Sequence, residues 1–372
     1  MIELESADFD KVRPLFEPLM DYQMFCAGVL DGLYSGRVFV DDRDHPQSGF
    51  VVKDRVWWFL AGAPDNESFH QALNTALFNR TVTGEKGWGG MLVCHPAEWD
   101  TAISAIYAPH IPITTKRLHY TCRQLDRDWR ADIPAGFEIR FVDESLAEDG
   151  IEIHGAAANV LELRQNTPEP DHKAVGFVAV HNRKIVASSV IDCIVDKGGD
   201  IGLYTDGAFR RRGLAYLTAA AVLEYALSHG VEVVHWDCEA FNTGSIRTAE
   251  KLGLHFSHDH TMYNLILNPT LHEVNRAWSH FDAGRYTLAM QICQQHIDAG
   301  QEPVHPHLYY VLARCHAHAA AYDAAMQTLT LAAKAGWDSV DEVEADFPAL
   351  AVRPEWPGLL EQIQQNAEAN PS

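Results

Sequence analysis

The sequence lacks the features that define several protein classes. Its seven cysteines are odd in number, scattered and never paired as Cys-x-x-Cys, which disfavours a disulfide framework or a zinc ribbon and favours a reducing compartment. No apolar run reaches the roughly 18 residues that a membrane span needs. The first residues have neither the basic start nor the apolar core of a signal peptide. We therefore expect a cytoplasmic protein that makes no membrane contact.

Basic residues are also scarce. The chain has 29 Lys and Arg against 51 Asp and Glu, a formal net charge of −22. Such a charge repels a nucleic-acid backbone, so DNA and RNA are disfavoured as partners, whereas cationic small molecules such as amines are attracted. A length of 372 residues exceeds one ordinary core and predicts two or three domains.

A basic turn between an expected strand and an expected helix is the most informative stretch of the chain. The turn runs from Phe209 to Ala215 with the sequence Phe-Arg-Arg-Arg-Gly-Leu-Ala, after a β-type run at 200–205 and before an apolar helix at 214–228. Free backbone N–H groups and the positive end of a helix dipole face an anion at such a place. Gly213 would let the backbone approach that anion closely, so the turn predicts a diphosphate site.

Composition and pattern divide the chain into three blocks, which we expect to be domains: residues 1–133, 134–268 and 269–372. The first block alternates helical patterns with three strand-like runs between residues 36 and 60, which predicts an α/β domain. A charged, linker-like stretch at 126–134 leads out of it.

The second block predicts a mixed α/β sheet. A hairpin is expected over 176–191, because an Asn-containing turn at 181–184 separates two β-rich runs. After the helix at 214–228 the pattern predicts, in order, a strand at 231–236, a short helix at 245–252 and two closing strands at 254–257 and 262–267.

The third block is helical in pattern and contains an internal repeat. Four positions recur 36 residues later: Ala277, Gly284, Tyr286 and Ala289 return as Ala313, Ala320, Tyr322 and Ala325. Small residues at helix crossings and an aromatic residue that opens the second helix are typical of packed helical hairpins. The spacing resembles tetratricopeptide repeats (TPRs), so we expect an all-α, TPR-like domain. A role in self-association or in binding a protein partner stays open beside a plain helical hairpin pair.

A second signature follows the basic turn at Asn242-Thr-Gly-Ser245 and Lys251-Leu-Gly253. Asn242 can cap a helix, and Gly253 suits the positive φ at a helix end. Together with the Arg-x-x-Gly-x-Ala pattern of the turn, these segments resemble the acetyl-CoA-binding motifs of the GNAT N-acetyltransferases. The resemblance implies a mixed-sheet GNAT acyl-CoA-binding fold for residues 134–268.

Two further phrases sharpen this resemblance. The runs at 36–46 and 201–206 look like the subgroup that includes zwittermicin A resistance acetyltransferases. In that subgroup the first block is itself similar to a degenerate GNAT half-domain, so the resemblance would cover roughly residues 1–268.

The resemblance implies transfer of an acetyl group from acetyl-CoA, as co-substrate, to a primary amine of a small molecule in a ternary complex. It assigns acetyl-CoA to three groups of residues: the strand residues Leu203, Tyr204 and Thr205, the loop residues Arg210, Arg211, Arg212, Gly213, Leu214 and Ala215, and the helix-entry residues Asn242 and Ser245. The strand would pair with the pantetheine arm, and the loop with the diphosphate.

The catalytic groups are where the sequence departs from the family. Ala249 stands where many members have a tyrosine, and Leu203-Tyr204 stands where many have a carboxylate. Departure of the thiolate would then rely on water or on the hydroxyl of Tyr204 or Tyr263, or be unassisted. Asp237 and Glu239 share one side of a strand, and they are the candidates for the base; ordinary solvated or capping carboxylates remain the alternative.

Two alternatives to consider are an adaptor function and a metal site. Loss of the usual tyrosine leaves open a catalytically impaired acyl-CoA-binding adaptor whose TPR-like tail recruits a protein. Histidines cluster at His255, His258 and His260, and again at His316 and His318. No Cys or carboxylate completes a convincing ligand set, so we expect surface or half-buried histidines and no metal.

Overall fold

A computed structural model describes residues 1–53, 56–82, 84, 89–166, 174–300 and 303–369. The chain forms two compact units, Met1–Asn264 and Leu265–Ser372. The domain division expected near residue 133 falls inside the first unit and stays a prediction.

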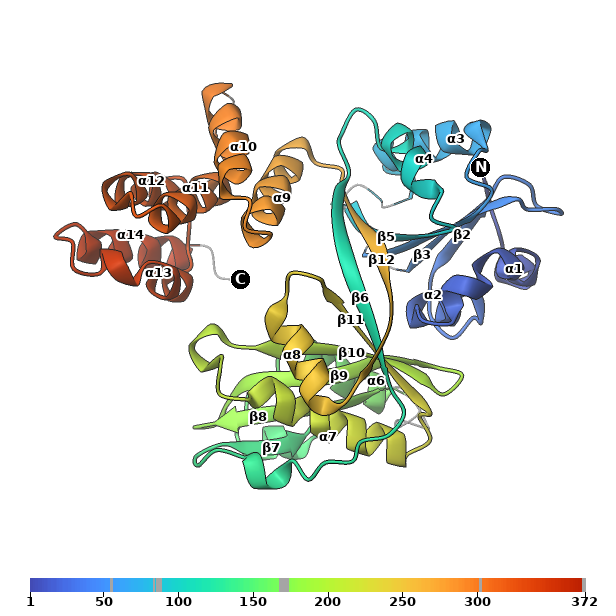
Figure 1. The fold of residues 1–372 in the computed structure, drawn as a ribbon, viewed down its shortest axis with the longest axis horizontal. Coiled ribbons are helices and arrows are strands. Elements are labelled where there is room, and N and C mark those ends of the chain that lie inside the picture. The colour runs from blue at the N-terminus through green and yellow to red at the C-terminus, as the bar shows by residue number, and fades with distance from the viewer. Residues whose placement is uncertain (54–55, 83, 85–88, 167–173, 301–302, 370–372) are drawn as a thin grey trace. The chain divides into compact units, whose positions relative to one another are not determined.

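The first unit is built on one sheet whose twelve strands lie in the order β1-β2-β3-β4-β5-β12-β6-β11-β10-β9-β8-β7 (Figure 1). The strands are β1 (Ile2–Glu3), β2 (Arg37–Val40), β3 (Ser48–Lys53), β4 (Trp57–Gly62), β5 (Gly89–His95), β6 (Ile113–Cys122), β7 (Glu138–Phe141), β8 (Val175–His181), β9 (Lys184–Val195), β10 (Gly198–Thr205), β11 (Val233–Glu239) and β12 (His255–Ile266). The helices of this unit are α1 (Phe9–Met20), α2 (Met24–Leu30), α3 (Glu67–Phe78), α4 (Trp99–Ile106), α5 (Ser145–Glu148), α6 (Gly155–Gln165), α7 (Leu214–Ser228) and α8 (Thr243–Leu252).

Two halves of this unit exchange their last strands. β6 ends the first half along the chain but lies between β12 and β11, whereas β12 ends the second half and lies beside β5. Figure 1 shows β6 and β12 as two long strands that run side by side between the halves. The antiparallel ladder from His255↔Thr121 to Asn264↔Ile113 ties them together. The exchange places side chains of both halves on one continuous sheet.

Helices cover both faces of the second half. β8 shows the alternation, because Val175 and Ala179 face the core that contains α7, whereas Val178 and Val180 face the core of α5 and α6. Helix α7 is apolar nearly all round and mostly buried, as a helix inside a core should be. In the first half, α1 and α2 lie on one side of β2–β5, and α3 and α4 on the other (Figure 1).

Several sequence-based expectations are confirmed at residue level. The hairpin turn lies at Asn182 and Arg183, both with positive φ, and α7 begins and ends where the pattern predicted. The prediction of two closing strands was wrong, because residues 255–266 form one strand, β12, with a bulge between Phe256 and His258. The polar residues that suggested a break, His258, Asp259 and His260, instead pair with His119, Leu118 and Arg117 of β6.

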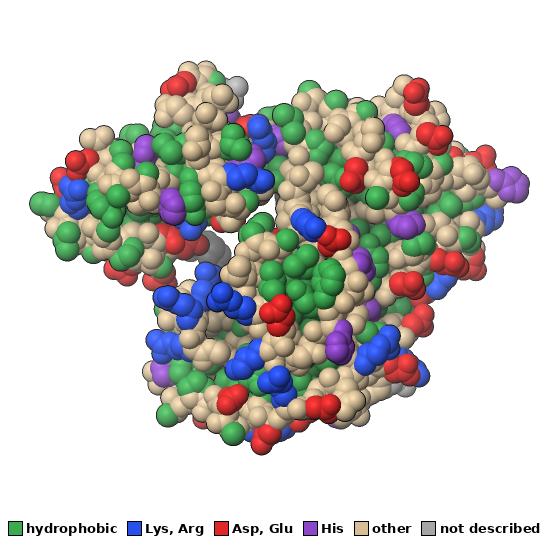
Figure 2. Space-filling model, in the orientation of Figure 1, with side chains coloured by type: hydrophobic (Ala, Val, Ile, Leu, Met, Phe, Trp, Pro, Cys, Tyr) green, Lys and Arg blue, Asp and Glu red, His purple; other side chains and the backbone are tan. Residues whose placement is uncertain are grey.

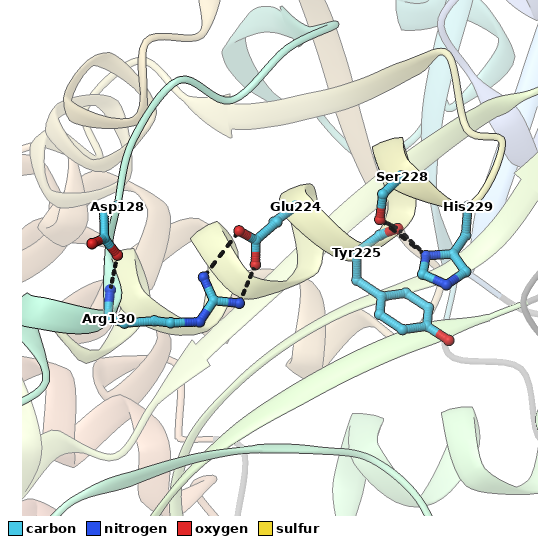
Figure 3. A network of polar contacts seen from close by, with 6 residues as sticks. All are labelled: Asp128, Arg130, Glu224, Tyr225, Ser228 and His229. Carbon is cyan, nitrogen blue, oxygen red and sulfur yellow. Dashed lines mark hydrogen bonds and ion pairs between the residues drawn. The ribbon is translucent and has the colours of Figure 1, made fainter.

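The linker-like stretch is fixed to the outside of α7. Arg130 donates to both carboxylate oxygens of Glu224, at 3.0 and 2.6 Å, and its own backbone N–H bonds to Asp128 at 3.2 Å (Figure 3). Nearby, the ring of His229 stacks on Tyr225 with centroids 3.9 Å apart. The Arg130–Glu224 pair holds the connection from β6 to β7 against the helix that follows the basic turn.

The second unit is helical: α9 (Pro269–Asp282), α10 (Tyr286–Asp298), α11 (Pro306–His318), α12 (Tyr322–Lys334), α13 (Val340–Asp346) and α14 (Trp356–Ala369). The sequence repeat is a structural repeat, since Tyr286 and Tyr322 open equivalent helices and Gly284 and Ala320 both have positive φ at the turns before them. Its small repeat residues are fully buried: Ala277, Ala289, Ala313 and Ala325. The helical hairpins are thus confirmed, while a TPR identity stays a proposal.

Candidate functional site

Strands β10 and β11 separate after a short parallel contact. They pair only from Gly198↔Val233 to Asp200↔His235. Beyond that point β10 continues to pair with β9, through Thr205↔Ala187, while β11 continues with β6, through Glu239↔Arg117. In the described part of the chain, the β11-facing backbone edge of residues 203–205 therefore has no strand partner. An extended molecule with amide groups fits such an edge as an added strand.

The loop after β10 leads into a helix start with no side-chain cap. Gly213 is the N-cap of α7, has φ of 78° and offers no capping atom. Within the described residues, the backbone N–H groups of residues 211–215 donate no hydrogen bond. Unpaired N–H donors at the positive end of a helix dipole are the groups that an anion site uses.

The basic residues of this loop add positive charge. The side chains of Arg210, Arg211 and Arg212 are exposed. Figure 2 shows Lys and Arg gathered at the left edge of the first unit, around the loop that follows β10. The sequence-predicted loop residues thus lie together, at the place where β10 and β11 have parted.

The entry to α8 has the local structure that the sequence predicted. The Asn242 side chain caps the helix by accepting from the Ser245 N–H at 3.1 Å, and Gly253 ends it with φ of 81°. The Ser245 hydroxyl accepts from the Trp236 indole N–H at 3.1 Å. The capping role is confirmed, and a contact of either side chain with acetyl-CoA stays a prediction.

Asp237 and Glu239 lie on one side of β11, as expected, and both are ion-paired. Arg117 on β6 lies 3.4 Å from Asp237 and 2.8 Å from Glu239. His260 lies 3.3 Å from the other oxygen of Asp237. Burial works to raise the pKa of Asp237, but the close approach of His260 and the charge of Arg117 together lower it. Both carboxylates therefore already hold a partner.

The two candidate tyrosines lie in different surroundings. Tyr204 on β10 is 54% exposed, beside the separated strands. Tyr263 on β12 is buried, and its hydroxyl donates to Asp100 of α4 in the first half. Burial and this hydrogen bond raise the pKa of Tyr263. Tyr204 thus lies on the strand that leads into the basic loop, whereas the Tyr263 hydroxyl is bonded to the first half.

A carboxylate that the sequence reading missed lies where the strands part. Asp200 is the last β10 residue paired with β11, at a bulge between Gly199 and Ile201. Burial raises its pKa to about 8, helped by the negative charges of Asp237 and Asp192 and opposed by Arg117. The sequence signal that could have pointed to Asp200 is a single acidic residue after two glycines at the start of a mostly apolar strand. The family's carboxylate position was matched to Leu203 and Tyr204 alone, and Asp200 was not considered.

A cluster of four histidines lies farther along the same face of the sheet. His119 and His235 contact each other at 3.2 Å, and Tyr22 of the first half lies against His119, His258 and His260. The cluster borders a cavity of about 800 Å³. Burial lowers the pKa of His119 to about 3 and that of His235 to about 4, so both are neutral at pH 7.

The sequence grouped His258 and His260 but missed His119 and His235. Their meeting depends on the exchange of β6 and β12, which sequence spacing does not reveal. Among the described residues, no group of His, Cys, Asp or Glu has an arrangement that would hold a metal ion. The described helices include none long and apolar enough to cross a bilayer.

Comparison with known proteins agrees with this geometry. A sequence model described as GNAT acetyltransferase matches residues 13–263, which lie within the first unit. The uncharacterized N-acetyltransferase YdfB of Bacillus subtilis (strain 168) is 23% identical over 261 residues, covering 70% of this chain and 97% of that protein.

A solved structure has a similar fold. A GCN5-related N-acetyltransferase-like protein from Streptococcus suis is 22% identical, with a TM-score of 0.52 over 70% of this chain and 98% of that one. A GCN5-related N-acetyltransferase from Sphaerobacter thermophilus is 14% identical, with a TM-score of 0.47 over 72% of this chain and 96% of that one.

Proposed function

Because the chain belongs to the GNAT acetyltransferase family and is therefore an N-acetyltransferase, we propose that it transfers acetyl from acetyl-CoA directly to a primary amine of a small molecule. The observation that carries this proposal is the separation of β10 from β11 beside the uncapped start of α7. Antibiotic-type amines, suggested by the zwittermicin A resistance subgroup, are among the acceptors to test.

We assign acetyl-CoA to the residues that the sequence singled out. The diphosphate meets the backbone N–H groups of residues 211–215, with Arg210 at the entry. The pantetheine arm lies along Leu203–Thr205 as an added strand, and Asn242 and Ser245 flank it at the start of α8. The exposed arginines and orphan N–H donors support this arrangement.

We assign the general base to Asp200 and prefer it to Asp237 and Glu239. A carboxylate with a pKa near 8 takes a proton from an ammonium group more readily than one held by Arg117. The free amine nitrogen then attacks the thioester carbon, the carbon–sulfur bond breaks, and the CoA thiolate leaves. The nitrogen gives up its extra proton as the amide forms, and this proton passes to sulfur through water or the exposed Tyr204 hydroxyl.

The first half and the helical unit also have proposed roles. We infer that residues 1–133 are a GNAT-like half, because β4, α3 and β5 repeat the order strand, helix and parallel strand. We infer that this half has no acetyl-CoA site of its own, because β4 and β5 stay paired and the start of α3 is capped. The repeated hairpins of the second unit support a TPR-like module for self-association or for a protein partner.

Thiol release tests the proposal. The purified full chain is incubated with acetyl-CoA and, separately, with polyamines, aminoglycosides and amino acids, and free thiol and acetylated product are measured together. At least one amine should raise thiol release above the rate without acceptor, with matching product. If acetyl-CoA binds and no amine in the panel raises thiol release, the proposal fails and the adaptor reading replaces it.

A further inference from the structure

A second cavity of the first unit, of about 420 Å³, lies apart from the cofactor loop. It is lined from both halves: Phe25, Tyr34, Lys53 and Trp57 come from the first half, and Glu162 and Asp192 from the second. Its volume is in the range of small-molecule sites. Because each half contributes only one wall, the cavity exists only in the joined unit.

The first-half wall is aromatic and already holds a positive charge. The rings of Phe25 and Trp57 stack with centroids 5.8 Å apart, and Tyr34 meets Phe25 edge-on at 6.4 Å. The Lys53 ammonium lies 5.7 Å from the Phe25 centroid and 6.0 Å from that of Tyr34. Aromatic faces attract cations at such distances, and Lys53 shows that this wall accepts an ammonium group.

The second-half wall is acidic. Glu162 projects from α6 and Asp192 from β9. Burial raises the pKa of Asp192, and the nearby charge of Lys53 works against that rise. Two carboxylates against one ammonium leave the described lining with one uncompensated negative charge when all three are ionised. A ligand with a single positive charge neutralises it, whereas an anion would worsen the imbalance.

The position of Asp192 connects this cavity to the chemistry. β9 and β10 are paired neighbours, and Ile191 of β9 lies opposite Ile201 of β10. Asp192 follows Ile191 and Asp200 precedes Ile201, so the two aspartates lie on adjacent strands at nearly the same level. The negative charge of Asp192 is among the causes that raise the pKa of Asp200. Adjacent strands lie about 5 Å apart, so a small acceptor can span the two carboxylates.

We infer that this cavity binds an organic cation, namely the second, protonated amine of a diamine-type acceptor whose first amine is acetylated beside Asp200. The cation lies between the Trp57–Phe25 wall and the carboxylates of Asp192 and Glu162. The site itself is independent of the proposed reaction, but its role in acceptor choice rests on the proposed function.

The test separates binding from catalysis by using a cation that cannot be acetylated. Tetramethylammonium is titrated into the full chain without acetyl-CoA, with neutral tert-butanol as the uncharged match, and binding is followed by calorimetry. Trp57→Leu and Asp192→Asn should each weaken tetramethylammonium binding about tenfold, whereas Trp57→Phe, which keeps an aromatic face, should stay within about threefold of wild type.

Acetyl transfer provides the second readout. Putrescine is compared with n-butylamine, and the wild type should show a KM for putrescine about tenfold lower than for n-butylamine. Glu162→Gln, on an exposed helix position, should shrink this preference with little effect on folding. Glu361→Gln in the second unit is the matched control and should leave it unchanged.

Each result has a distinct meaning. Tetramethylammonium binding no stronger than tert-butanol binding, or unchanged in both Trp57→Leu and Asp192→Asn, overturns the cation site. If these variants lose tetramethylammonium yet no amine is acetylated, the site stands and the proposed function fails. If acetylation proceeds with equal KM for both amines, the function stands and the assigned acceptor class is wrong.

Discussion

The two halves of the first unit each contain a strand, a helix and a parallel strand, but they end differently at the helix start. β4 and β5 pair over five residues, from Trp57↔Met91 to Ala61↔His95, whereas β10 and β11 pair over three and then part. The start of α3 is capped by the Asn66 side chain, which accepts from the Phe69 N–H at 3.1 Å. The start of α7 has Gly213 and no such cap.

This difference shows what turns a common fold segment into a ligand site. In the first half the strand edge and the helix N–H groups are satisfied within the protein, so they have little left to offer a ligand. In the second half both are left over, at adjacent positions. The proposed site therefore consists largely of hydrogen-bonding groups that the fold leaves unpaired.

The largest expected effect comes from Asp200→Asn, which removes the proposed base from the second half. We expect kcat to fall about 10²- to 10⁴-fold while acetyl-CoA affinity stays unchanged, because general-base catalysis is lost and the loop is intact. Asp196→Asn is the matched control, since Asp196 lies at an exposed turn with positive φ that Asn tolerates.

The pH profile sharpens this prediction. The base works when ionised, so the wild-type rate should fall as pH falls through about 8, the raised pKa of Asp200. Asp200→Asn should lose that limb of the profile. A limb that persists in Asp200→Asn, with kcat near wild type, contradicts the assignment.

Gly213→Asp changes the proposed acetyl-CoA-binding loop of the second half. Its φ of 78° disfavours a side chain, and the new carboxylate would face the diphosphate, so acetyl-CoA affinity should fall about 100-fold or more. Gly32→Asp adds the same charge at a similar φ of 68° in the first half and should leave affinity unchanged. Calorimetric titration compares the two, and equal affinities would rule out the loop.

The smallest effect concerns the capped helix of the first half. Asn66→Ala removes the cap and the bonds from its amide to Asp41 and Ser48, so the free energy of unfolding should fall by about 1–2 kcal/mol. Acetyl-CoA affinity should not change. Urea unfolding and calorimetry measure the two quantities, and a large loss of affinity would mean that the first half takes part in cofactor binding.

Local features were predictable from the sequence, and long-range ones were not. Asn242 and Gly253 mark the ends of α8 because caps depend on residues within one turn, and the start of α7 follows from Gly213 in the same way. The pairing of His119 with His235 depends on the strand exchange. The raised pKa of Asp200 depends on burial by distant segments, which a local pattern does not carry.

The stoichiometry of acetyl-CoA binding tests the central claim most directly. Calorimetric titration of the wild-type full chain should give one acetyl-CoA per chain, because among the described residues the corresponding segment of the first half has its strands paired (β4 with β5) and its helix start (α3) capped. Two equivalents per chain, or one equivalent that survives in Gly213→Asp with unchanged affinity, would contradict the account.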